Sequence, residues 1–126
     1  MMGYSLATLY AVAQVIYDKK GTNILALDVR GLSSITDYLL IAEGNVDRHV
    51  SSMARAIVED LAAKGIHPLH VEGMKVGDWV VLDYGEIMVH LFTPGVRGKY
   101  ALERLWPDSK IVDLAIDVSK PAIGNC

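Results

Sequence analysis

Four histidines have side chains suited to metal binding or proton transfer: His49, His67, His70 and His90. His67 and His70 are three residues apart around a predicted strand, so their side chains face opposite sides and do not readily share a metal. A helical metal site would need a second ligand four residues after His49, and that position is Met53. Because Cys126 is the only cysteine, the sequence predicts neither a cysteine metal site nor an internal disulfide.

His90 is the histidine best placed for catalysis, because it lies diagonally from Asp83 on a predicted hairpin. A His–Asp pair catalyses acyl transfer only beside a nucleophile. The candidate serines lie at 33–34 in a loop and at 51–52 at a helix start, without the sequence of a nucleophile elbow. We therefore expect His90 to be a polar anchor in a partner-binding face, or else an ordinary hydrogen-bonded histidine of the sheet.

Phosphate chemistry also lacks its usual sequence patterns. The glycine-containing stretch 95–98 is not followed by the Lys-Ser/Thr pair of a P-loop. Two-metal phosphoryl transfer usually takes two carboxylates that lie two residues apart on one strand. Here Asp28 is followed by Arg30 and Asp83 by Gly85, so neither strand supplies the pair.

One basic and aromatic patch raises the question of nucleic-acid binding. It consists of Arg97, Lys99, Tyr100, Arg104 and Trp106, and it is interrupted by Glu103 and Asp108. The whole chain is acidic, with 12 Lys and Arg against 15 Asp and Glu and a formal net charge of −3. Proteins that depend on phosphate contacts usually show the opposite balance. We interpret the patch as a solvated helix face and expect no sequence-specific nucleic acid.

The spacing of apolar residues predicts the elements that position these groups. Helices are expected at 4–20, 45–64 and within 94–106, strands at 24–29, 38–43 and 68–72, and a hairpin at 78–92. This order indicates an α/β fold, with a mixed sheet of about five strands flanked by helices. Residues 1–108 are predicted to form the domain and 109–126 a C-terminal extension, either an extra strand or an extended tail.

The predicted hairpin gives the sheet two different faces. With a turn at Gly85-Glu86, one face is wholly apolar and pairs Tyr84 with Ile87, Leu82 with Val89 and Val80 with Leu91. The opposite face pairs Trp79 with Phe92, Val81 with His90 and Asp83 with Met88. Apolar anchors around polar centres are typical of the core of an interface. The alternative is that a helix covers this face and that all six side chains belong to the ordinary core.

The composition and the N-terminal residues of the chain predict its location in the cell. The chain is 52% hydrophobic over 126 residues, which favours one folded domain. No run of about 18 apolar residues occurs, so we expect no membrane span. Residues 1–20 lack the basic leader and cleavage site of a signal peptide. These features together predict a cytoplasmic protein.

Three stretches of the chain together resemble the bacterial ribosomal silencing factors, also called the Iojap family. They are LDVRGLSSITDYLLIAEG with RHV (27–50), VEG with DWVVLDYGEIMVHLF (71–92), and VR followed by Tyr100 and LERLW (96–106). The resemblance runs from about residue 5 to residue 108 in the family's order and spacing. Each motif alone is weak, but the three in this order are highly specific.

The resemblance implies a non-enzymatic repressor of translation that needs no cofactor. Such proteins dock on the fourteenth protein of the large ribosomal subunit and block the bridge that it makes with the small subunit. The subunits then fail to join, and protein synthesis falls when nutrients are short. The resemblance also implies a fold similar to the nucleotidyltransferase type. The partner-binding residues that we expect are Trp79, Val81, Asp83, Met88, His90, Phe92, Arg97 and Tyr100.

Two other functions stay open on the sequence. A nucleotide-handling enzyme on the transferase-like fold would bind nucleotides or divalent metal ions. A binder of single-stranded RNA would show an RNA affinity that falls steeply with salt. The net charge of −3 suits a basic protein partner better than naked RNA, and a homodimer is compatible with the sequence.

Overall fold

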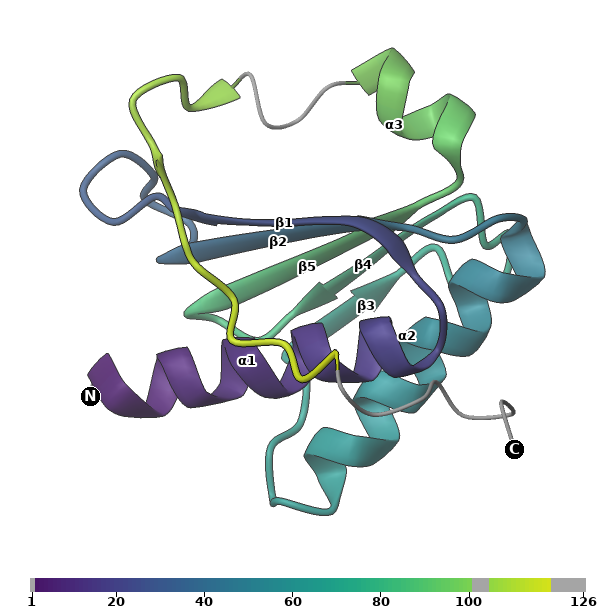
Figure 1. Ribbon diagram of the computed structural model, residues 1–126, viewed down its shortest axis with the longest axis horizontal. Coiled ribbons are helices and arrows are strands. Elements are labelled where there is room, and N and C mark those ends of the chain that lie inside the picture. Colours follow the sequence, from purple (N-terminus) through teal and green to yellow (C-terminus); the bar gives the residue numbers. More distant parts are fainter. Residues whose placement is uncertain (1, 101–104, 119–126) are drawn as a thin grey trace.

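One mixed sheet with helices on both sides forms the fold (Figure 1). The computed structural model describes residues 2–100 and 105–118. The helices are α1 (Met2–Asp18), α2 (Asp47–Ala62) and α3 (Pro94–Tyr100). The strands are β1 (Thr22–Asp28), β2 (Tyr38–Glu43), β3 (His70–Glu72), β4 (Trp79–Asp83), β5 (Ile87–Phe92) and β6 (Lys110–Ile111). The predicted α/β class is confirmed, whereas the likeness to nucleotidyltransferases stays a prediction.

The six strands among the described residues follow the order β3-β4-β5-β2-β1-β6. β2 and β5 run parallel, and the other neighbours are antiparallel; the chain between β2 and β5 contains the crossover helix α2 and then β3 and β4. β3 lies at the sheet edge, as expected from Pro68, which cannot donate a ladder hydrogen bond. The hairpin register is also confirmed, since Leu82 pairs with Val89 and Trp79 with Phe92. Gly85 takes a φ of +85° in the turn, which favours glycine.

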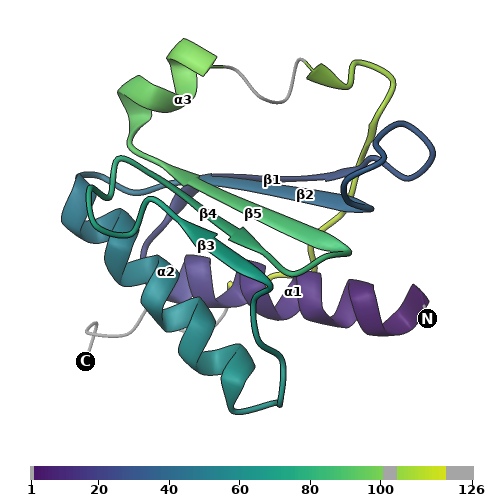
Figure 2. The ribbon, with the colours of Figure 1, turned by 180° about the vertical axis from the view of Figure 1, so that it is seen from behind.

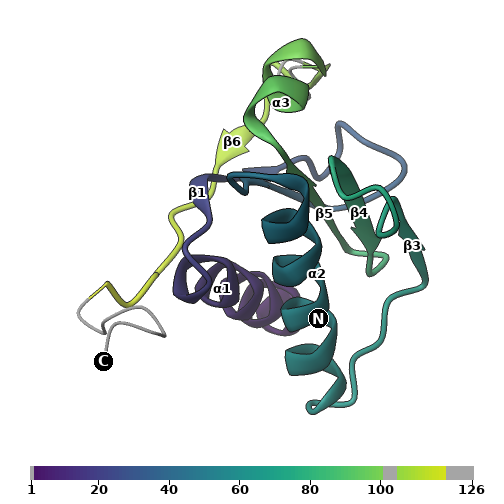
Figure 3. The ribbon, with the colours of Figure 1, turned by 90° about the vertical axis from the view of Figure 1, so that its right-hand side faces the viewer.

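Both long helices pack on the same face of the sheet, which we call the inner face (Figures 2 and 3). α1 and α2 bury their apolar stripes there, as their sequence spacing predicts. The buried side chains of this core come from both helices and from alternate strand positions: Leu9, Val12, Ala13, Ile16, Leu40, Val50, Met53, Ala54, Ile57, Leu61, Val80, Leu82, Val89 and Leu91. Close packing against two helices makes the inner face the structural core.

α2 begins later than the apolar spacing suggested, at Asp47. The residues before it continue the strand geometry, because the Gly44 N–H donates to the Phe92 carbonyl at 2.9 Å. Val46 is the N-cap and has an extended backbone with φ −142°. The helix ends at Ala62, just before the predicted Lys64-Gly65 stop. None of the described helices has the length and apolarity that crossing a membrane requires.

The segment after residue 108 lies against the domain. Lys110 and Ile111 pair with Asp28 and Leu27 as β6, and the Val112 N–H donates to Ala26 at 2.9 Å. Further along, Asp117 exchanges hydrogen bonds with Gln14 of α1. The described residues thus form six strands, in agreement with the predicted mixed sheet of about five, and part of the segment left open between a strand and a tail is a two-residue strand. A domain boundary after residue 108 stays a prediction.

Candidate docking face

The opposite face of the sheet, here called the outer face, carries the predicted partner-binding residues of β4 and β5. Strand side chains alternate between the faces, and α1 and α2 lie across the inner one. On the outer side, Figure 3 shows α3 and the β6 segment above the sheet. The alternative of a covering helix applies to part of this face, because α3 lies at one end of it and Val96 packs against buried Phe92, while Trp79, Val81, Asp83 and Met88 stay partly exposed.

One part of the outer face is closed. Its buried side chains come from β1, β2 and β5: Leu27, Val29, Leu39, Ile41 and Phe92. Val96 of α3 and Trp106 pack against this cluster. Phe92 is 1% exposed. A role for Phe92 in docking would therefore be to support the residues around it.

Arg97 holds α3 in place over the closed part. Its guanidinium donates to the Glu43 carboxylate at 3.1 Å and to the backbone carbonyl of Asn23. The Arg97 and Glu43 side chains are only 13% and 12% exposed, so water screens the pair weakly. The structure thus places Arg97 between α3 and the ends of β1 and β2. Tyr100 is the last residue of α3, and its side chain lies outside the part that the structure describes.

The other part of the outer face, which we call the open part, is formed by four half-buried side chains of the hairpin: Trp79, Val81, Asp83 and Met88. Their strand neighbours Val80 and Leu82 are completely buried on the inner face. The open part is therefore an apolar surface on two rigid, paired strands. Such a surface is suited to contact with another macromolecule, because strands hold side chains more firmly than loops do.

His90 fixes the largest of these side chains. Its Nδ1 accepts a hydrogen bond of 3.0 Å from the indole Nε1–H of Trp79. The Trp79 ring also packs on Phe92, with 5.1 Å between the ring centroids. Burial lowers the pKa of His90 to about 4, so the imidazole is neutral at neutral pH and its proton sits on Nε2. A neutral His90 is what allows Trp79 to donate to Nδ1.

Asp83 and His90 do not form a catalytic pair. The Asp83 carboxylate accepts a hydrogen bond of 2.8 Å from the Gly85 N–H, which closes the hairpin turn. His90 bonds instead to Trp79. The two side chains share a face, as predicted, but each is committed to a different neighbour. A general base with its orienting carboxylate is therefore not assembled here.

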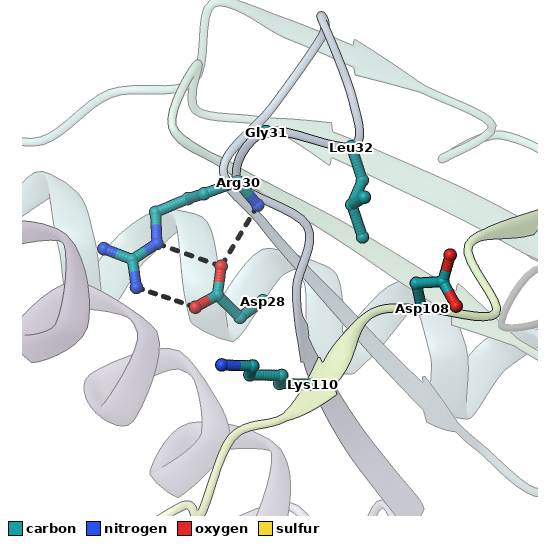
Figure 4. A pocket seen from close by; sticks show the side chains of 6 residues that line it. All are labelled: Asp28, Arg30, Gly31, Leu32, Asp108 and Lys110. Atoms are coloured by element: carbon teal, nitrogen blue, oxygen red, sulfur yellow. Dashed lines mark hydrogen bonds and ion pairs between the residues drawn. The ribbon is translucent and has the colours of Figure 1, made fainter.

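A hollow of about 520 Å³ lies at the C-terminal end of β1, away from the Arg97–Asn23 contact. It is lined by residues of β1, of the loop that follows β1, and of the β6 segment (Figure 4). Asp28 accepts bonds of 2.9 and 2.7 Å from the Arg30 guanidinium, and Arg30 lowers the pKa of Asp28. Asp108 stands apart from Asp28 in Figure 4. No metal-binding group of three His, Cys, Asp or Glu occurs among the described residues. The hollow therefore lacks the paired carboxylates of a phosphoryl-transfer site.

The basic and aromatic patch is not one surface in the described part of the chain. Trp106 packs against the closed part of the outer face, and Arg97 is paired with Glu43. Arg104 and the side chain of Lys99 lie outside the described residues. A nucleic-acid surface on this patch is thus not supported.

These features define an α/β protein with one sheet face buried by two helices and, among the described residues, the other face only partly covered. The family model described as "Ribosomal silencing factor during starvation" matches residues 4–123. The chain belongs to this family, the ribosomal silencing factors. The membership confirms the predicted family and the prediction of a non-enzymatic factor.

Individual relatives agree with the family match. The chain is 41% identical over 97 residues to the ribosomal silencing factor RsfS of Bacillus subtilis, covering 77% of this chain and 82% of that one. A crystal structure of a protein from Chromobacterium violaceum superposes with a TM-score of 0.76 at 30% identity, over 94% and 96% of the two chains. A more distant mouse relative, "Mitochondrial assembly of ribosomal large subunit protein 1", is 28% identical over 75% of this chain and 43% of its own.

Proposed function

We propose that the open part of the outer face docks on the fourteenth protein of the large ribosomal subunit. Docking there blocks the bridge to the small subunit, prevents the subunits from joining and so represses translation in the cytoplasm. The observation that carries the proposal is the half-buried group Trp79, Val81 and Met88, held on paired strands and left partly exposed by the residues that the structure describes. Family membership supports the ribosome as the target.

The open part has the properties of an interface hot spot. Trp79 is a large aromatic anchor, the residue type that most often dominates binding energy. Its hydrogen bond to His90 and its packing on Phe92 already restrict its rotamer. Binding therefore loses little side-chain entropy at this position. Buried Phe92 and His90 contribute from beneath, while Arg97 positions α3, which carries Tyr100 at the border.

The charges around the open part favour a basic protein partner. Asp83 lies on the outer face, and Glu72 of β3 shares that face because it pairs with Val81. The chain as a whole carries a formal net charge of −3. Ribosomal proteins are generally basic, so the potentials of the two surfaces are complementary. The same apolar surface is the natural contact for a homodimer, which would compete with docking.

Order of addition to purified subunits tests the proposal. Protein mixed with separated subunits before magnesium is raised should shift a sucrose gradient from joined ribosomes toward free subunits. Protein added to ribosomes already joined should do much less, because its docking surface is then occupied. About one protein per large subunit should suffice. Wild-type protein that leaves joining unchanged at several-fold excess would falsify the proposal.

A further inference from the structure

A second surface, outside the docking face, carries an unusual concentration of positive charge. It is a hollow of about 370 Å³ between α2 and the β3–β4 turn, here called the basic hollow. Its lining residues are Asp47, Arg48, Ser51, Arg55, Met74, Lys75 and Val76. Three of these side chains are cationic and one is acidic, in a chain whose formal net charge is −3.

Two separate segments are held together to form the basic hollow. Arg48, Ser51 and Arg55 are spaced by three and four residues, so they lie along one side of α2. Ser51 Oγ donates to the backbone carbonyl of Met74 at 3.1 Å. Gly77 has a φ of +85°, and a Cβ there would lie 2.7 Å from the Asp47 carbonyl oxygen. The turn is therefore seated on the helix, which brings Lys75 to the two arginines.

Arg48, Arg55 and Lys75 form none of the ion pairs found within residues 2–100 and 105–118. The ion pairs in the described part of the chain join four other pairs of residues: Arg30 with Asp28, Lys64 with Asp60, His70 with Glu72, and Arg97 with Glu43. Asp47, the acidic residue of the lining, accepts a hydrogen bond of 2.7 Å from the Arg48 backbone N–H. Three like charges held close together repel one another, and a bound polyanion would relieve that repulsion.

The basic hollow adjoins the docking face. Its turn leads directly into β4, whose first residue is Trp79, and α2 begins soon after the end of β2. Figure 2 shows the β3–β4 turn beside the first turns of α2, at one end of the sheet. The basic hollow therefore lies at one end of the strands that carry the open part.

We propose that the basic hollow binds phosphate groups of ribosomal RNA next to the protein on which the outer face docks. The inference rests on the proposed function, because the large subunit supplies RNA beside that protein. An arginine guanidinium group can donate two parallel hydrogen bonds to two oxygens of one phosphate, whereas a lysine ammonium group acts as a point charge. The chain has a net charge of −3, so RNA phosphates would repel it as a whole. The cations of the basic hollow supply local attraction that offsets this repulsion.

Charge-neutralising variants test the inference on the full-length protein. Arg48→Gln with Arg55→Gln should weaken binding to isolated large subunits about tenfold at low salt. The plot of log affinity against log salt should become shallower by about 0.7–0.9 for each lost phosphate contact. Lys75→Gln alone should give a smaller change in the same direction. Binding to the isolated fourteenth ribosomal protein, which carries no RNA, should be unchanged in all these variants.

A matched control removes the same charge elsewhere. Lys20→Gln with Lys64→Gln neutralises two exposed cations outside the hollow and should leave the affinity and salt slope near wild type. An equal loss in this control would overturn the inference in favour of overall charge. Equal weakening toward the RNA-free ribosomal protein would overturn it in favour of a protein contact. Wild-type protein that binds neither target would reject the proposed function, and the inference with it.

Discussion

The inner and outer faces of the sheet are built from alternate residues of the same strands, yet their environments differ. On β4, Val80 and Leu82 are completely buried, whereas the alternate residues Trp79 and Val81 are only half-buried. Both faces are largely apolar, so composition alone does not distinguish the covered face from the proposed docking surface. The difference arises from what lies above each face: α1 and α2 cover the inner one, and the short α3 covers one end of the outer one.

This arrangement follows from the connections of the chain. The parallel pairing of β2 and β5 requires a crossover, and α2 supplies it on the inner side. α1 packs beside α2, and together the two helices bury the apolar side chains of the inner face. α3 comes after the last strand of the hairpin, and its described residues, Pro94–Tyr100, lie at one end of the outer face. The β4 side of the outer face is left open as a result.

The largest effect should come from the inner face. Leu82→Ala removes a fully buried side chain between the sheet and the helices and should lower the free energy of unfolding by about 2–5 kcal/mol. Val81→Ala, one residue away on the outer face, should lower it by less than about 1.5 kcal/mol, because its side chain is only half-buried. Urea denaturation of both variants measures the difference. Equal losses would show that the two faces are not distinct.

Acid should lower the free energy of unfolding of the protein through His90 on the outer face. The pKa of His90 in the folded protein is about 4, against 6.5 for an ordinary histidine. The unfolded chain therefore binds a proton first, and the stability that neutral His90 contributes is complete above about pH 6.5 and is lost as the pH falls toward 4. At about 1.4 kcal/mol for each pKa unit, the loss approaches about 3 kcal/mol.

The His90 contribution is measured as a difference between variants. Urea unfolding of wild type and His90→Gln is compared near pH 7 and pH 4, since glutamine keeps an acceptor for Trp79. The variant should lose less stability on acidification than wild type does. His67→Gln, which changes an exposed histidine, should follow the wild-type curve. Parallel curves for wild type and His90→Gln would contradict a buried, neutral His90.

The docking role of the outer face should appear as a loss of binding. Trp79→Ala should weaken binding to large subunits by about 2 kcal/mol, or about thirtyfold, because a central aromatic anchor is removed. It also leaves His90 without its donor, so stability must be measured in parallel. Met88→Lys places a charge on the half-buried surface and should abolish docking with a smaller effect on folding. Full activity in both folded variants would exclude the outer face as the interface.

Much of the fold follows from local sequence patterns. The hairpin register was predicted from the turn at Gly85 and the alternation of apolar residues, and it is confirmed because both signals are local. For residues 109–126 the sequence left an extra strand and an extended tail both open, because two paired residues leave no periodic signal that decides between them. The start of α2 was placed too early, since Gly44 still bonds to the neighbouring strand.

The environment of the candidate site was harder to predict, because it depends on contacts between distant residues. Nothing local shows that Phe92 is buried under α3, or that Arg97 pairs with Glu43. The basic hollow was missed for the same reason. The spacing of Arg48 and Arg55 on one side of a helix is visible in the sequence, but the approach of Lys75 depends on the seated turn.

Tyr84 offers the smallest and most specific test of the inner face. Its ring packs against the inner core, and its hydroxyl is buried without a hydrogen-bond partner among the described residues. Burial raises the pKa of Tyr84 to about 12. A buried hydroxyl without a partner loses its bonds to water and gains none in return, so Tyr84→Phe should raise the free energy of unfolding by less than about 1 kcal/mol. Leu82→Ala, on the same face, should shift it strongly the other way. A loss of more than about 1 kcal/mol in Tyr84→Phe, measured by urea denaturation, would show that the hydroxyl has a partner and that the inner face is less apolar than described.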